Sequence, residues 1–211
     1  MAKQVIDIGS AANDGTGDTL RDAMTKANSN FTELYAVEPS IVQKLYDTAG
    51  FGFYVEDQTT PSTQVITTTP TLLEIDGLGA TSTSAYIPHE IRGISELWDS
   101  TVNEIKPIGI GDGYTVRIDL QITAKGGSPT EIKLELDING GATPSIVIVE
   151  RIINTGKTPP YTVAVGFPFF TLDTFFANGG RIFLSTDSGT ITLTNRSISI
   201  HRISNGNLWL T

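Results

Sequence analysis

Apolar and polar residues alternate along two adjoining stretches in the middle of the chain. The first stretch covers residues 114–122 and the second covers residues 131–138, with a Gly-rich loop at 126–129 between them. Successive side chains of a β-strand point to opposite faces, so each stretch has one apolar and one polar face. Two such strands joined by a Gly-rich loop predict an antiparallel hairpin.

More strands of the same kind follow toward the C-terminus. Residues 161–169 alternate strictly, and shorter apolar runs lie at 146–153, 182–184, 191–193 and 198–203. Asn-Gly-Gly, Asn-Thr-Gly and Asp-Ser-Gly sequences between them are typical of turns. Many short strands separated by turns favour a sandwich over a parallel sheet. The predicted fold class is therefore mainly β, an antiparallel jelly-roll sandwich preceded by a small helical segment.

This part of the chain has more apolar residues than one sandwich readily buries. Residues 146–149 are apolar on both faces, whereas a strand of a two-layer sandwich normally has an outer face in water. The phenylalanines between 167 and 176 also occupy both odd-numbered and even-numbered positions. Because neighbouring positions of a strand point to opposite faces, these side chains cannot all point inward. Either a loop folds some of them into the core, or an apolar face is buried against another copy of the chain.

One clear helical pattern precedes the strands. Thr19 and Asp22 match an N-cap with its capping-box partner. The apolar stripe either packs on its own domain or forms a short coiled-coil seam between copies. Its members are spaced four, three, four and three residues apart: Leu20, Met24, Ala27, Phe31 and Leu34.

A second short helix is predicted directly after the first. Pro39 suits a first helical position, and Ser40 with Gln43 forms another capping-box pair. Ile41 and Leu45 then supply an apolar side.

We place a domain boundary in the following stretch. Residues 49–63 mix aromatic residues with Gly, Thr and Pro, which is typical of a linker or a first edge strand. Residues 1–57 are predicted to form an N-terminal anchoring segment with one or two short helices. Residues 58–211 are predicted to form the jelly-roll domain, beginning with two short strands around Pro70.

Charge and composition narrow the possible partners. The formal net charge is -9 and the sequence has no basic cluster, so neither nucleic acid nor an anionic membrane is an expected partner. The sequence contains no cysteine, which excludes disulfides and thiol catalysis. No apolar run approaches the length of a membrane span, and no signal peptide is expected.

The sequence lacks the motifs of the common catalytic sites. His89 and His201 lie far apart and match no metal-ligand spacing, and no serine lies in a Gly-x-Ser-x-Gly elbow. The Gly15-Thr16-Gly17 turn fits neither a phosphate-binding loop nor a dinucleotide-binding loop. We therefore expect no catalytic residue, no metal and no cofactor, and the chain is not expected to be an enzyme.

A cluster of Asn, Asp, Gly and Thr precedes the helical stripe and forms a recognisable pattern with it. The residues of the pattern are Ile8, Gly9, Ala12, Asn13, Asp14, Gly15, Thr16, Gly17, Asp18, Leu20, Arg21, Ala23, Lys26, Asn28, Asn30, Phe31, Glu33, Leu34 and Tyr35. This pattern resembles a sequence found near the N-terminus of structural proteins of tailed bacteriophages, such as fibre and decoration proteins. The resemblance implies a segment that attaches the chain to the virion, through the major capsid protein or through a tail or neck protein. The attachment residues it implies are Asn13, Asp14, Gly15, Thr16, Gly17, Asp18, Leu20, Arg21, Phe31, Leu34 and Tyr35.

The chain from about residue 64 onward shows a second resemblance. The residues that carry it are Leu97-Trp98-Asp99, Asn103, Ile105, Pro107, Gly113-Tyr114, Asp173-Thr174-Phe175, Asn178-Gly179-Gly180 and 198–203. They are similar to jelly-roll modules of the TNF/C1q-like type, which occur on phage fibres and capsids and form homotrimers through aromatic and aliphatic faces. With the apolar surplus, this resemblance predicts a homotrimer. The predicted interface residues are Tyr114, Ile146, Ile148, Phe167, Phe169, Phe175 and Phe176.

Three functions are compatible with these patterns. The first is a structural protein on the exterior surface of a phage capsid or tail, of the capsid-decoration, head-fibre or tail-fibre type. The second is a receptor-binding or glycan-binding module of a tail fibre or baseplate, with a host surface glycan as partner. The third is an enzyme acting on surface polysaccharide. The modest length of 211 residues favours the first, because receptor-binding fibres usually carry longer shafts.

Overall fold

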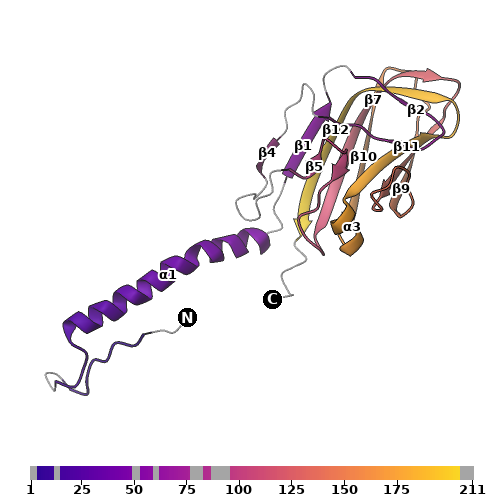
Figure 1. Cartoon of the computed structure of the whole chain (residues 1–211). Helices are drawn as coiled ribbons and strands as arrows, with labels where there is room; N and C mark the ends of the chain where they lie inside the picture. Colours follow the sequence, from indigo (N-terminus) through magenta and orange to yellow (C-terminus); the bar gives the residue numbers. More distant parts are fainter. Residues whose placement is uncertain are drawn as a thin grey trace. The chain divides into compact units, whose positions relative to one another are not determined.

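The chain folds into two compact units (Figure 1). The computed structural model describes residues 4–11, 15–48, 53–58, 62–76, 83–86 and 96–204. The first unit, Met1–Tyr46, contains an extended segment and most of a long helix. The second unit, Asp47–Thr211, is a sandwich of two antiparallel sheets.

One continuous helix, α1 (Leu20–Thr48), occupies the region where two short helices are predicted (Figure 1). Its start is as expected: the Asp22 N–H donates to Thr19 Oγ1 at 3.2 Å, and the Thr19 hydroxyl donates to the Asp22 carboxylate at 2.6 Å. The prediction that a new helix begins at Pro39 is wrong, because α1 runs through this residue. A proline inside a helix removes one hydrogen bond and crowds the preceding turn.

Six strands form the first sheet, in the order β10-β7-β12-β1-β4, with β2 also paired to β12. The two longest strands, β7 and β12, pair with each other from Gly113↔Ser204 to Gly126↔Thr190. The strands are β1 (Phe53–Gln58), β2 (Gln64–Ile66), β4 (Thr83–Tyr86), β7 (Gly113–Gly126), β10 (Tyr161–Phe170) and β12 (Thr190–Ser204).

Six further strands form the second sheet, in the order β5-β6-β11-β8-β9, with β3 also paired to β11. Consecutive strands mostly cross from one sheet to the other, and two antiparallel sheets connected in this way form a jelly roll. The predicted fold class is therefore confirmed. The elements are β3 (Thr71–Leu72), β5 (Trp98–Asp99), β6 (Glu104–Ile105), β8 (Glu131–Asp137), β9 (Val147–Asn154) and β11 (Gly180–Thr186), with the short helix α3 (Asp173–Asn178) between β10 and β11.

The hairpin predicted from the two alternating stretches is wrong. Strand β7 pairs with β10 and β12 in the first sheet, whereas β8 pairs with β11 and β9 in the second. The Gly-rich loop between β7 and β8 therefore carries the chain across the core from one sheet to the other. The alternation of apolar and polar residues shows which side chains face the core. It is the same in both sheets of a sandwich, so it does not show which sheet a strand belongs to.

The hydrophobic core lies between the two sheets and is filled by their inward-facing residues. From Tyr114 to Ile122, every second residue of β7 is fully buried, and the facing strands β8 and β11 contribute branched aliphatic side chains from the opposite sheet. The principal buried residues are Val116, Ile118, Leu120 and Ile122 of β7, Ile191, Leu193, Ile198 and Ile200 of β12, Ile132, Leu134 and Leu136 of β8, and Ile182 and Leu184 of β11.

A buried ion pair joins the end of β12 to the start of β7. Arg202 Nε lies 2.8 Å from Asp112 Oδ2 and Nη2 lies 3.1 Å from Oδ1, and both side chains are fully buried. The Tyr114 hydroxyl donates to Asp112 at 3.1 Å and accepts the Ile108 N–H at 2.7 Å. Burial, reinforced by the charge of Asp112, raises the pKa of Tyr114 far above its ordinary value. Tyr114 therefore remains protonated and serves as a donor to the carboxylate.

The sandwich begins earlier in the chain than the boundary predicted between residues 57 and 58. Strand β1 pairs with β12 from Phe53↔His201 to Gln58↔Arg196, so residues 53–57 belong to the first sheet. The two compact units divide after Tyr46. The aromatic composition of this stretch therefore corresponds to a strand of the sheet and not to a linker.

We expect Asp112→Ala to lower the free energy of unfolding by about 3–5 kcal/mol, because the buried guanidinium of Arg202 then loses its counter-charge. Arg117→Met is the matched control, since the ion pair between Arg117 and Asp119 is partly exposed and screened by solvent. Urea denaturation followed by circular dichroism measures both variants. A loss for Asp112→Ala no larger than that for Arg117→Met would contradict the structural role of the buried pair.

Candidate attachment site in the N-terminal unit

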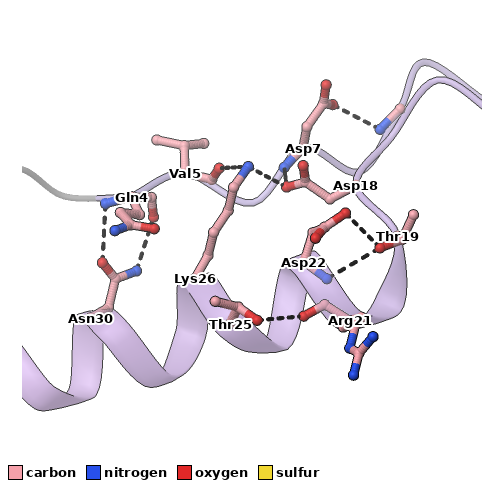
Figure 2. Close-up of polar contacts among 11 residues, drawn as sticks. Gln4, Val5, Asp7, Asp18, Thr19, Arg21, Asp22, Thr25, Lys26 and Asn30 are labelled. Atoms are coloured by element: carbon pink, nitrogen blue, oxygen red, sulfur yellow. Dashed lines mark hydrogen bonds and ion pairs between the residues drawn. The ribbon is translucent and has the colours of Figure 1, made fainter.

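An extended segment, residues 4–9, lies along α1 and is held to it by polar contacts (Figure 2). The first contact is made by the side-chain amide of Asn30. The Gln4 N–H donates to Asn30 Oδ1 at 3.0 Å, and Asn30 Nδ2 donates to the Gln4 carbonyl at 2.9 Å. One side chain of the helix thus pairs with both backbone groups of the same residue.

Lys26 makes the second contact, one helical turn before Asn30. Its ammonium group donates to the Val5 carbonyl at 3.1 Å and lies 2.6 Å from Asp18 Oδ2 (Figure 2). Residues four apart share one face of a helix, so Lys26 and Asn30 both face the extended segment. Lys26 links this segment to the turn that precedes α1.

Asp18 closes that turn against Asp7. The Asp7 N–H donates to Asp18 Oδ2 at 2.8 Å, and the Asp18 N–H donates to the Asp7 carbonyl at 2.8 Å. The hydrogen bond from Lys26, followed by the one from the Asp7 amide, holds the pKa of Asp18 below its ordinary value despite the opposing effect of burial. We call these contacts of Gln4, Val5, Asp7, Asp18, Lys26 and Asn30 the N-terminal clip.

A glycine allows the two arms of the clip to approach closely. A Cβ atom at Gly17 would lie 2.7 Å from Gly9 N, 2.8 Å from Ile8 C and 2.9 Å from Asp7 O. All three are backbone atoms, which cannot move aside as the end of a flexible side chain could. Position 17 therefore requires glycine for the segment to pass the start of α1.

The N-terminal unit has no buried core in the part of the chain that the structure describes. Among residues 4–11 and 15–36, none is buried. The large apolar side chains are exposed to water, including Leu20 at 81%, Phe31 at 56% and Leu34 at 58%. Val5, Ile8 and Met24 are exposed in the same way. Polar contacts hold the unit's shape, and its apolar surface has no partner within it.

The predicted attachment residues that the structure describes lie in the turn before α1 and on α1 itself. Asn13 and Asp14 lie outside the described residues. Four form the turn before the helix: Gly15, Thr16, Gly17 and Asp18. Five lie exposed on α1: Leu20, Arg21, Phe31, Leu34 and Tyr35. Their role in attachment remains a prediction.

The residues predicted for attachment leave out five that build the clip, namely Gln4, Val5, Asp7, Lys26 and Asn30, although Lys26 and Asn30 belong to the pattern that carries the resemblance. Lys26 and Asn30 are four residues apart on a predicted helix, which is a signal for a shared polar face. Nothing in the sequence indicates that residues 4–7, more than twenty positions away, supply the partner backbone.

The residues predicted for a trimer interface also separate into two groups. Four are buried in the core of the single chain: Tyr114, Phe167, Phe169 and Phe175. Their rings pack together, with centroids 5.2 Å apart for Tyr114 and Phe169 and 4.9 Å apart for Phe169 and Phe175. Strand β10 and the helix α3 turn these side chains inward, so they have no surface with which to contact another copy. Ile146, Ile148 and Phe176 are exposed.

Strand β9 forms an edge of the second sheet, and its exposed residues include several apolar side chains beside Glu150 and Arg151. It pairs only with β8 in the described sheet, through Glu131↔Asn154 to Asp137↔Val147. Val149 and Ile153 pack on the core, while Val147, Ile148 and Ile152 are exposed, with Ile146 just before the strand. An apolar edge strand of this kind is a surface for association with another chain.

The described residues offer no metal-binding cluster. No group of three or more His, Asp or Glu suited to a metal ion occurs among them. His201 is exposed on β12, and His89 lies outside the described residues. In the same part of the chain, no helix has the length and apolar character needed to cross a membrane.

Residues 3–88 match the family described as bacteriophage T4 gp9/10-like protein, N-terminal. This part of the chain is a phage structural-protein domain of that family. The match covers the whole clip and α1, and it continues into the first strands of the jelly roll as far as β4. It confirms the family predicted from the Asn-Asp-Gly-Thr-Gly-Asp pattern, while residues 89–211 lie outside the match. No curated protein sequence matches the chain.

Two solved structures illustrate the likeness of the fold. The Eiger TNF structure from S. frugiperda is 9% identical, covers 74% of this chain and 94% of its own, and gives a TM-score of 0.43. The PRD1 vertex protein P5 is 10% identical, covers 72% of this chain and 97% of its own, and gives a TM-score of 0.40. Because both scores are low, the assignment of the jelly roll rests on the strand order of the two sheets.

We expect NMR titration of the Asp18 carboxyl group to give a pKa below 3.8, and Lys26→Met to raise it, because Lys26 supplies the largest favourable interaction. A pKa lowered by folding means that Asp18 stabilises the clip above pH 3.8 and that this contribution is lost as the pH falls through the lower folded value. Lys133→Met is the control, since Lys133 pairs with Glu135 and Glu150 in the jelly roll. An Asp18 pKa that is insensitive to Lys26→Met would contradict the clip.

Proposed function

We propose that this phage structural protein is a homotrimeric decoration or fibre protein on the exterior of the virion. Its N-terminal unit attaches it to the particle, through the major capsid protein or a tail or neck protein, and its jelly roll projects outward. The observation that carries the proposal is the absence of any buried residue among the described positions 4–36, although large apolar side chains are present there.

The exposed stripe of α1 is the surface that needs a partner. Burying a side chain such as Leu20, Phe31 or Leu34 is worth about 1.5–3 kcal/mol each, so association with another chain would stabilise the unit substantially. The clip supports this use, because Lys26 and Asn30 hold the extended segment on a different face of α1 from the stripe. The stripe is thus left open for a partner.

The continuity of α1 extends the stripe beyond its predicted end. Ile41 and Leu45 follow Leu34 at intervals of seven and four residues, so they keep the same heptad spacing along one helix. A heptad repeat of this kind favours the association of several helices. Copies of α1 joined through this seam would bring three jelly rolls together at one attachment point.

The edge of the jelly roll supplies a second surface for self-association. Ile146 and Ile148, both predicted interface residues, lie on or beside the apolar edge strand β9. A soluble protein normally protects such an edge with charge, proline or another chain. A second copy seated against β9 would explain why Ile146, Ile148 and Ile152 are exposed on this edge beside Glu150 and Arg151.

We expect light scattering to give a mass close to three times 22.6 kDa for the full chain. Ile148→Glu should lower the mass toward that of one chain, because a charge would enter the β9 contact. Val65→Glu is the matched control, since Val65 is an exposed apolar residue on β2, outside this edge. A wild-type protein that stays monomeric over a wide concentration range would contradict the homotrimer.

We expect deletion of residues 1–48 to leave a folded jelly roll that no longer joins the particle, because β1 begins only at Phe53. In the full chain, Phe31→Asp should abolish attachment by placing a charge in the apolar stripe. Ala36→Asp is its control on the opposite face of α1. Co-purification with virions measures attachment, and a truncated protein that still assembles onto virions would overturn the anchoring role.

A further inference from the structure

The stability of the N-terminal unit does not account for Arg21. This residue lies in the first turn of α1 and is exposed to water. Figure 2 shows its side chain on the side of α1 that faces away from the extended segment, and it takes part in no ion pair among the described residues. A cation in the first turn also opposes the positive end of the helix dipole. Its position therefore indicates a partner outside the unit.

The extended segment presents a carboxylate of the opposite charge near the start of the same helix. Asp7 Oδ1 accepts the Gly9 N–H at 2.9 Å, and among the described residues this carboxylate is paired with no cation. The Asp7 N–H donates to Asp18 Oδ2 at 2.8 Å, which places Asp7 beside the beginning of α1. Asp18 precedes Arg21 by three residues, so Asp7 and Arg21 lie at a similar level along the helix.

The extended segment and Arg21 lie on opposite flanks of the apolar stripe. Successive residues of an α-helix are rotated by about 100°, so Lys26 and Asn30 lie about 100° to one side of the stripe and Arg21 lies about 100° to the other. In a parallel bundle joined through the stripe, one flank of each helix meets the opposite flank of the next helix. Such a bundle would bring the extended segment of one copy beside Arg21 of a second copy.

We propose that the extended segment of each copy docks in the outer groove between its own α1 and the α1 of a second copy, where Asp7 pairs with Arg21 of that copy. The inference rests on the proposed homotrimer and names a contact within it. The segment's exposed apolar side chains, Val5 and Ile8, would be covered by the neighbouring helix. The contact joins two different surfaces, so it can repeat around a threefold axis and close a ring.

The N-terminal clip prepares the segment for this contact. Asn30 and Lys26 bind the backbone of the segment, and Gly17 lets it pass close to the start of α1. Because these contacts leave the Asp7 carboxylate on the surface, the clip and the ion pair between copies do not compete for the same atoms. The segment is therefore ordered before association, which lowers the entropic cost of binding.

Disulfide cross-linking tests the contact directly, because the natural sequence contains no cysteine. We expect oxidation of the full chain carrying both Asp7→Cys and Arg21→Cys to give covalent trimers on a non-reducing gel. The two positions lie on opposite sides of α1 within one chain (Figure 2), so a bond within the chain is not expected. Asp7→Cys with Thr25→Cys is the matched control, since Thr25 is exposed and lies about 140° from the stripe. The control should give several-fold less covalent trimer.

Charge reversal gives an independent measurement. Arg21→Glu should raise several-fold the concentration at which the trimer dissociates, even though a carboxylate in the first turn favours the helix itself. Adding Asp7→Lys to this variant should restore the wild-type concentration, because the two charges are then exchanged. A role of Arg21 within its own unit would not produce this restoration.

The outcomes separate this contact from the homotrimer on which it rests. A trimeric wild type, together with no covalent trimer from Asp7→Cys and Arg21→Cys or as much from the control, would overturn the contact alone. A monomeric wild type would overturn the homotrimer and the contact together. If Arg21→Glu abolished co-purification with virions and left the dissociation concentration unchanged, the virion surface would be the partner of Arg21 and the proposal would be wrong.

Discussion

The pairing of β7 with β12 is the contact on which the jelly roll depends. These two strands run beside each other from Gly113 to Gly126, and their inward faces supply much of the core. Strand β10 pairs with the free side of β7, and β1 and β2 pair with the free side of β12. The buried pair of Asp112 and Arg202 fixes one end of this ladder. Removing β7 would leave β10 without a partner in the first sheet, and removing β12 would leave β2 without one and separate β1 and β4 from β7.

The two units of the protein are stabilised by different kinds of interaction. The jelly roll buries its apolar residues between two sheets, so the hydrophobic effect stabilises it without a partner. The N-terminal unit relies on Lys26, Asn30 and Asp18, which pair with backbone groups, while its apolar side chains remain in water. Exposed polar contacts contribute little free energy. The clip therefore sets the shape of the unit, while its exposed apolar side chains add little to the unit's own stability.

Much of the fold could be predicted from local pattern, whereas the pairing of distant segments could not. Alternation located β7, β8 and β10 and their inward faces, because the period of a strand is visible in sequence. The same alternation holds for both sheets, so it suggested a hairpin between β7 and β8 that does not exist. The helix start at Thr19 was local and correct, whereas Pro39, a residue typical of a first helical position, suggested a second start that does not exist. The clip joins Gln4 to Asn30 across 26 positions, and no periodic pattern records such a contact.

The way in which Asn30 holds Gln4 has a consequence for which sequences this unit tolerates. The amide of Asn30 contacts only the N–H and the carbonyl of residue 4, as a neighbouring β-strand would. Any residue with a backbone N–H can therefore occupy position 4, and proline is the one that removes the donor. At position 30 an aspartate would lose the donating half of the pair. The side chain at position 4 is therefore free to vary, while Asn30 keeps the register of the arm on the helix unchanged.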